Sequence, residues 1–242
     1  MNLVSTASVR NYWERLPTSL RLIVKARLWT AIGAGGVLYL SPVIFNGLGF
    51  SAEQIGSGIT NAAFAGIITR LATGYLLDHK HSYRKTIKVA CILAVIADLI
   101  LFYSQSYITY LAGEFFLGAA AGIYWPSIEL AVPSNCNNKI KSSEGFAIAR
   151  SADAIGVTLG VLIGTIGTYF ELTRIIYLID IFCMLYIINI LTNKLNILIM
   201  NEPLENQIEL EYVYTIPIKV SKENWILDLF PLLSITLFVT GV

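Results

Sequence analysis

The sequence predicts an all-α fold, a polytopic membrane bundle of six spanning helices followed by the start of a seventh. Hydrophobic residues make up 55% of the 242 residues and charged residues only 14%, whereas soluble domains are about a quarter charged. The apolar residues form runs of about 20, which match the roughly 30 Å hydrocarbon core of a bilayer at 1.5 Å per helical residue. Runs such as 89–100 also lack the alternating polarity of barrel strands.

The predicted elements follow one another with short connections. A polar N-terminal segment, 1–27, precedes the first apolar run, which we interpret as a span rather than a cleaved signal peptide because further membrane sequence follows it. Each run is expected to be helical, because lipid offers no partner to backbone polar groups. The six spans are placed at 28–48, 55–77, 86–104, 107–131, 145–169 and 173–193. A loop at 194–224 leads to 225–242, which is predicted to be the start of a seventh span, truncated at Val242.

The distribution of basic residues predicts the orientation. The first, third and fifth connections hold at most one Lys or Arg, whereas the N-terminal segment and the second and fourth connections hold several. Because positive charge is retained on the cytoplasmic side, we expect the N-terminus and the 194–224 loop to be cytoplasmic, in the inner or plasma membrane of the cell. The residues concerned are Arg10, Arg15, Arg21, Lys25 and Arg27, then Lys80, Arg84, Lys85 and Lys88, then Lys139 and Lys141.

Charge and motif content argue against several other classes of protein. The net charge of +1 gives no argument for nucleic acid as a partner. Cys91 and Cys183 lie in apolar runs and Cys136 in a basic loop, so no disulfide framework is expected. The sequence contains no P-loop, no metal-spaced His/Cys cluster and no catalytic triad pattern. We therefore expect no enzyme, no metal site and no cofactor.

Glycines recur at helical spacing in two of the predicted spans. Gly118 and Gly122 lie four residues apart in the fourth span, and Gly156, Gly160 and Gly164 are spaced in the same way in the fifth. Each set shares one helix face and lets another backbone approach closely, which is how helices associate in lipid. We interpret these faces as packing surfaces; the alternative is that they also slide during a transport cycle.

A short motif follows the second span. Gly74-x-Leu76-x-Asp78 precedes a loop that holds the basic pair Arg84 and Lys85. This resembles the signature loop of the major facilitator superfamily, which reads approximately Gly-x-Leu-x-Asp-Arg-x-Gly-Arg-Arg. The first three residues match in place and the basic pair matches in kind about two residues late, while the family's loop Arg and loop Gly have no counterpart.

The resemblance implies half of a twelve-helix architecture, with the chain as its N-terminal six-helix bundle. It also implies secondary active transport of a small solute by alternating access, with the loop at Asp78 as a conformational latch. Asp78 ends a helix where the macrodipole disfavours negative charge, so it is expected to have a partner such as Arg70, Arg84 or Lys85. The alternative for this loop is a charged turn that only sets the topology.

Charges inside the predicted spans need an explanation, since each costs about 2.5–3.5 kcal/mol at the bilayer centre. Glu114 shares a face with the glycines of the fourth span, stands where many family members have Arg, and is the leading candidate for a substrate- or proton-linked carboxylate. A buried structural hydrogen bond is its alternative. Arg150 and Asp153, three residues apart, can pair with each other, and Asp153 is a second candidate for proton coupling. Arg70 shares a face with the signature loop and can snorkel to the interface.

Two further acidic residues, Asp98 and Asp180, lie in the third and sixth predicted spans. The resemblance implies that these two helices are peripheral to the solute cavity, so both residues rank below Glu114. The expected partners of the chain are the lipid bilayer, a small-molecule solute, and a second six-helix half or a second copy of the chain. The alternative functions are a non-transporting membrane accessory protein and a non-functional transporter fragment.

Overall fold

The computed structural model describes residues 12–79, 82–136 and 140–194, and within these ranges the chain is mostly helical and forms no strand. The all-α prediction is therefore confirmed for the described part. The long helices are α2 (Thr18–Gly47), α3 (Ala52–Asp78), α4 (Tyr83–Tyr103), α5 (Tyr107–Ser134), α6 (Ser142–Tyr169) and α7 (Ile175–Asn189), which continues into a short π-helix, Ile190–Lys194. The predicted run at 225–242, and all but the first residue of the 194–224 loop, lie outside the described residues.

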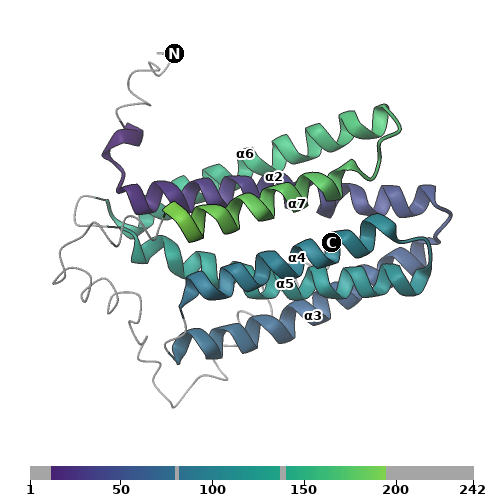
Figure 1. Ribbon diagram of the computed structural model, residues 1–242, viewed down its shortest axis with the longest axis horizontal. Helices are drawn as coiled ribbons and strands as arrows, with labels where there is room; N and C mark the ends of the chain where they lie inside the picture. Colours follow the sequence, from purple (N-terminus) through teal and green to yellow (C-terminus); the bar gives the residue numbers. More distant parts are fainter. Residues whose placement is uncertain (1–11, 80–81, 137–139, 195–242) are drawn as a thin grey trace.

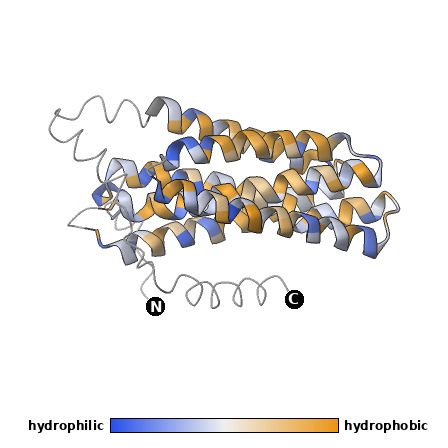
Figure 2. Ribbon diagram, turned by 90° about the horizontal axis from the view of Figure 1, so that it is seen from below, coloured by the Kyte–Doolittle hydropathy of each residue, from blue (hydrophilic) through white to orange (hydrophobic). Residues whose placement is uncertain are grey.

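Five of the helices are long and apolar enough to cross a membrane: α2, α4, α5, α6 and the helix Ile175–Thr192. Helices of 21 to 30 residues extend about 30–45 Å, enough for the hydrocarbon core. Figure 2 shows hydrophobic residues along most of their length and hydrophilic residues gathered mainly toward the two ends. The remaining long helix, α3, has 27 residues but is less apolar, because it is rich in glycine, serine and threonine.

Polar residues define where several helices begin. Ser51 and Gln54 form a reciprocal capping box at the start of α3, and Ser106 and Thr109 form another at the start of α5. Helix α2 begins at Thr18, directly after Pro17, and therefore includes residues that the sequence analysis placed in the segment before the first span. Proline suits a helix start because its fixed φ is already helical and its missing N–H would have no partner there.

The helices run up and down in two layers of three (Figure 1). In one layer α2 lies between α6 and α7, and in the other α5 lies between α3 and α4. The layers meet mainly where α4 packs against α7. We call the end at which α2, α4 and α6 begin the basic end, because several lysines and arginines lie at or near these helix starts, namely Arg21, Lys25, Arg84, Lys85, Lys88 and Lys141, whereas Arg174 lies at the opposite end.

Glycines mark the closest helix crossings within each layer. A Cβ added to Gly118 would lie 2.5 Å from Cα of Ala62, so α5 and α3 touch there through their backbones. A Cβ on Gly156 would lie 2.6 Å from the carbonyl oxygen of Leu28, and one on Gly160 would also meet the α2 backbone. The two glycine faces thus lie at the α5–α3 and α6–α2 crossings, where a larger side chain would push the helices apart.

Candidate functional site

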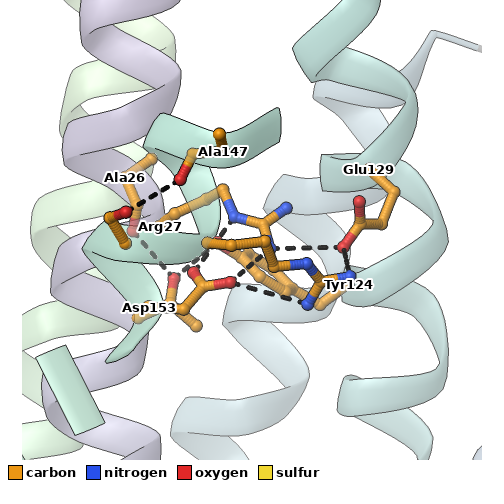
Figure 3. A network of polar contacts seen from close by, with 9 residues as sticks. Ala26, Arg27, Tyr124, Glu129, Ala147 and Asp153 are labelled. Atoms are coloured by element: carbon orange, nitrogen blue, oxygen red, sulfur yellow. Dashed lines mark hydrogen bonds and ion pairs between the residues drawn. The ribbon is translucent and has the colours of Figure 1, made fainter. Parts of the chain in front are cut away.

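Four charged side chains meet near the basic end, where α2, α5 and α6 come together (Figure 3). Arg27 of α2 has a side chain that is 0% exposed. Its Nε donates to Oδ1 of Asp153 at 3.0 Å, and its Nη2 donates to Oδ2 of Asp153 and to Oε1 of Glu129, the latter at 3.2 Å. Arg150, which is 63% exposed, adds contacts of 2.7 Å to Glu129 and 3.7 Å to Asp153. Two positive and two negative charges therefore balance, and we call these residues the ion-pair cluster.

An aromatic side chain of α5 also contacts the buried guanidinium, and a second one bonds α2 nearby. The Arg27 guanidinium carbon lies 5.6 Å from the centre of the Trp125 ring, within the range of a cation–π contact. One helical turn along α2, the Thr30 hydroxyl is 2.5 Å from the hydroxyl of Tyr124, and both side chains are buried. The cluster and its aromatic neighbours thus connect α2 to both α5 and α6.

The sequence analysis missed the central member of this cluster. Arg150 and Asp153 do lie together as expected, but Arg27 makes the closer and more buried contacts with Asp153. Arg27 was assigned to the polar N-terminal segment because the apolar run begins after it. The usable signal was Pro17, which places the helix start early enough for Arg27 to lie inside the helix.

A second polar group lies deeper in the bundle, where α2, α5 and α7 meet. Glu114 of α5 is only 6% exposed and interacts with the hydroxyl of Ser41 on α2. The same Ser41 hydroxyl is 2.9 Å from the hydroxyl of Tyr177 on α7. Glu114 therefore faces other helices, as the sequence predicts, and a serine from another helix is its polar neighbour. Asp98 and Asp180 are also fully buried, between α4 and α7.

A small cavity of about 60 Å³ opens beside Asp180. Its wall comes from α2, α4, α5 and α7 and is mostly apolar, with the polar groups of Thr30, Tyr124 and Asp180. This volume accommodates a few water molecules, at about 10–15 Å³ each. The cavity itself is therefore too small for most solutes.

The residues of the signature loop lie apart from both polar groups. Arg70, Asp78 and Lys85 are exposed, and the Arg84 guanidinium lies 5.9 Å from the centre of the Tyr83 ring. Among the described residues, no atom lies within 4 Å of a Cβ placed on Gly74. In contrast to the glycines of α5 and α6, Gly74 therefore makes no close approach to the helices described.

Comparison with known proteins agrees with the motif. The family model described as Major Facilitator Superfamily matches residues 26–237. The match covers most of the chain and includes the ion-pair cluster, the buried Glu114 and the signature loop. A comparison with curated proteins found no match. The chain is an integral membrane protein with multiple spans, and it belongs to the major facilitator superfamily.

Proposed function

We propose that this chain is the N-terminal half of a secondary active transporter, which moves a small solute across the membrane by alternating access. Family membership supports this proposal, and the observation that carries it is the buried carboxyl group of Glu114. Ionisable side chains within a membrane bundle are costly and mark solute or proton pathways. Glu114 meets a serine hydroxyl of α2, and that hydroxyl also meets Tyr177 of α7.

Of the two acidic candidates for coupling, Glu114 is the better supported. Asp153 accepts hydrogen bonds from Arg27 and lies near Arg150, so its charge is already balanced. No arginine or lysine is among the groups that act on Glu114 in the described part of the chain. A carboxyl without a cation partner can exchange a proton or a solute cation without first breaking an ion pair.

The ion-pair cluster has a mechanical role in this proposal. Alternating access requires each six-helix bundle to rock as one body around the solute site. Arg27 ties α2 to α5 and α6 at the basic end, which couples the two layers at that end. The signature segment with Gly74, Asp78, Arg84 and Lys85 is proposed to be the latch, which contacts the second half in one state and separates in the other.

The second half is proposed to be a further six-helix bundle or a second copy of this chain. Large apolar side chains of α3 and α6 are exposed, for example Phe64 at 61% and Leu162 at 54%. These surfaces suit either lipid or another bundle. Cysteines introduced on α3 and α6 in native membranes test this: crosslinks to another bundle indicate a bundle partner, and their absence indicates that these surfaces face lipid.

Substitution of Glu114 by glutamine is expected to abolish gradient-driven uptake while leaving membrane insertion unchanged. Glutamine keeps the size of the side chain and its hydrogen bonding to Ser41, but it cannot ionise. Uptake by the chain together with its second half is measured in proteoliposomes against a panel of small solutes, with and without an imposed pH gradient. Glu53→Gln is the matched control, since Glu53 is an exposed carboxylate in the first turn of α3. Normal uptake by the Glu114 variant contradicts the assignment.

The basic end is proposed to face the cytoplasm, and Cys136 provides a test. It is the only cysteine that is not buried, and it lies at the basic end just after α5. Burial and the nearby Glu144 carboxylate raise the pKa of the Cys136 thiol, so its reaction with a maleimide should be slow and should accelerate as the pH rises. A membrane-impermeant maleimide should label inverted vesicles and not right-side-out ones, and Cys136→Ser should remove the label. Labelling of right-side-out vesicles only would reverse the orientation.

A further inference from the structure

Two aspartates face each other in the interior of the bundle, outside the ion-pair cluster and near enough to Glu114 for its carboxyl to act on Asp98. Asp98 of α4 is 0% exposed and Asp180 of α7 is 1% exposed. Their carboxyl groups are close enough to interact directly. Apart from this mutual contact, no described group donates a hydrogen bond to either oxygen of Asp98 or to Oδ1 of Asp180.

Among the described residues, no cation is among the groups that act on the pair. The groups that act on Asp98 are Asp180 and the carboxyl of Glu114 on α5. Asp180 in turn influences two thiols, Cys91 of α4 and Cys183 of α7. The hydroxyls of Tyr177 and Tyr124 also lie in this interior. Arg27 acts on Tyr124, but in the described part of the chain it does not act on either aspartate.

Helix α2 contributes a glycine at the point where it passes Asp180. A Cβ added to Gly33 would lie 2.9 Å from Cα of Asp180 and would also meet its Oδ1. Only a residue without a side chain therefore allows α2 to cover Asp180 this closely. The carboxyl pair is thus enclosed by α2 as well as by α4 and α7.

Two adjacent carboxylates in such a place cannot both be charged. A buried charge without a partner loses its hydration and gains nothing in return, and the two negative charges also repel each other. Two carboxyl groups that interact directly in a buried site typically share one proton. A hard metal cation is a poor alternative, because calcium collects about 6–8 oxygen ligands, and the described residues contain no group of three or more His, Cys, Asp or Glu side chains that could hold a metal ion.

We propose that Asp98 and Asp180 form a proton-binding carboxyl pair, which holds one proton between α4 and α7 and exchanges it with water in the cavity beside Asp180. Asp180 itself lines that cavity, whereas Asp98 is not among its lining residues. On release, the O–H bond of the protonated carboxyl breaks, the electron pair stays on the carboxylate, and a cavity water takes the proton. The proposal does not rest on the transport function, because it concerns proton binding by this chain alone.

The test uses dicyclohexylcarbodiimide, an apolar reagent that adds only to protonated carboxyl groups and leaves a stable N-acylurea. The full chain is reconstituted in lipid nanodiscs, labelled over a range of pH, digested and analysed by mass spectrometry. We expect adducts on the Asp98 or Asp180 peptides, with at most one adduct per molecule. Above the titration midpoint the labelling should fall about tenfold per pH unit. Loss of labelling on addition of sodium chloride would indicate a cation site and overturn the proposal.

A second measurement covers the case in which the reagent does not reach the pair. Infrared spectroscopy detects the C=O stretch of a protonated carboxyl, and its shift in deuterated water identifies it. At neutral pH we expect a band that disappears in the double variant Asp98→Asn/Asp180→Asn and persists in Glu114→Gln. Gly33→Ala should shift the same band, because its methyl group presses on Asp180. An unchanged spectrum in the double variant overturns the proposal.

Discussion

Replacing Arg27 by methionine is expected to lower the free energy of unfolding by about 3 kcal/mol, at the lower end of the range for a broken buried ion pair. The side chain of Arg27 is 0% exposed, and its removal leaves Asp153 and Glu129 without their closest cation. The cost falls at the lower end because these two carboxylates keep 14% and 29% exposure and can partly regain water. Unfolding of the purified chain in detergent micelles, followed by circular dichroism, measures the difference.

The matched control is Arg150→Met in the same cluster. Arg150 contacts the same two carboxylates but is 63% exposed, so its loss should cost about 0–1 kcal/mol, as for other surface pairs. The double variant Arg27→Met/Asp153→Leu should recover part of the lost stability, because it no longer buries an unpaired carboxylate. Equal free energies of unfolding for Arg27→Met and Arg150→Met would contradict the claim that burial makes the contacts of Arg27 more stabilising than those of Arg150.

The second large effect is expected from Gly118→Ala, which should destabilise the bundle by about 1–3 kcal/mol. The added methyl group would lie 2.5 Å from Cα of Ala62 and would also meet its carbonyl group. Because these atoms belong to the backbone of α3, no side-chain rotation relieves the clash, and α5 and α3 must move apart. Thermal unfolding of the variant in the same detergent measures the loss.

Gly74→Ala is the contrasting substitution. Among the described residues no atom lies within 4 Å of the added Cβ, so helix propensity decides the outcome. Alanine should leave the bundle unchanged or stabilise it by about 0.5–1 kcal/mol. Loss of uptake in this otherwise stable variant would support the proposed contact between the latch and the second half. Destabilisation as large as that of Gly118→Ala would show that Gly74 packs within the bundle.

Much of the fold could be predicted because it depends on local properties of the sequence. Long apolar runs identify membrane helices wherever they occur, and the resemblance carried by Gly74, Leu76 and Asp78 agrees with the family match. Glycines spaced four apart predicted faces that do lie at helix crossings. The start of α2 was harder to predict. Residues 18–27 are less apolar than the rest of the helix, so hydropathy alone assigns them to a polar segment.

The polar contacts were less predictable, because they join residues far apart in the sequence. Arg150 and Asp153 are neighbours on one helix, so their proximity follows from spacing. The contact of Arg27 with Asp153 spans 126 residues, and nothing in the local sequence of either residue indicates the other. The pairing of Asp98 with Asp180 was equally hard to predict from the sequence, because it depends on how α4 packs against α7.

The long separation within the ion-pair cluster has a consequence for the order of events during synthesis. At about 5–20 residues per second, Asp153 leaves the ribosome about 6–25 s after Arg27. Glu129, 102 residues after Arg27, is also made late. Until Glu129 has been made, about 5–20 s after Arg27, the guanidinium has neither carboxylate. We therefore expect the start of α2 to stay at the membrane surface, with its arginine in contact with water, until the fifth predicted span supplies Asp153.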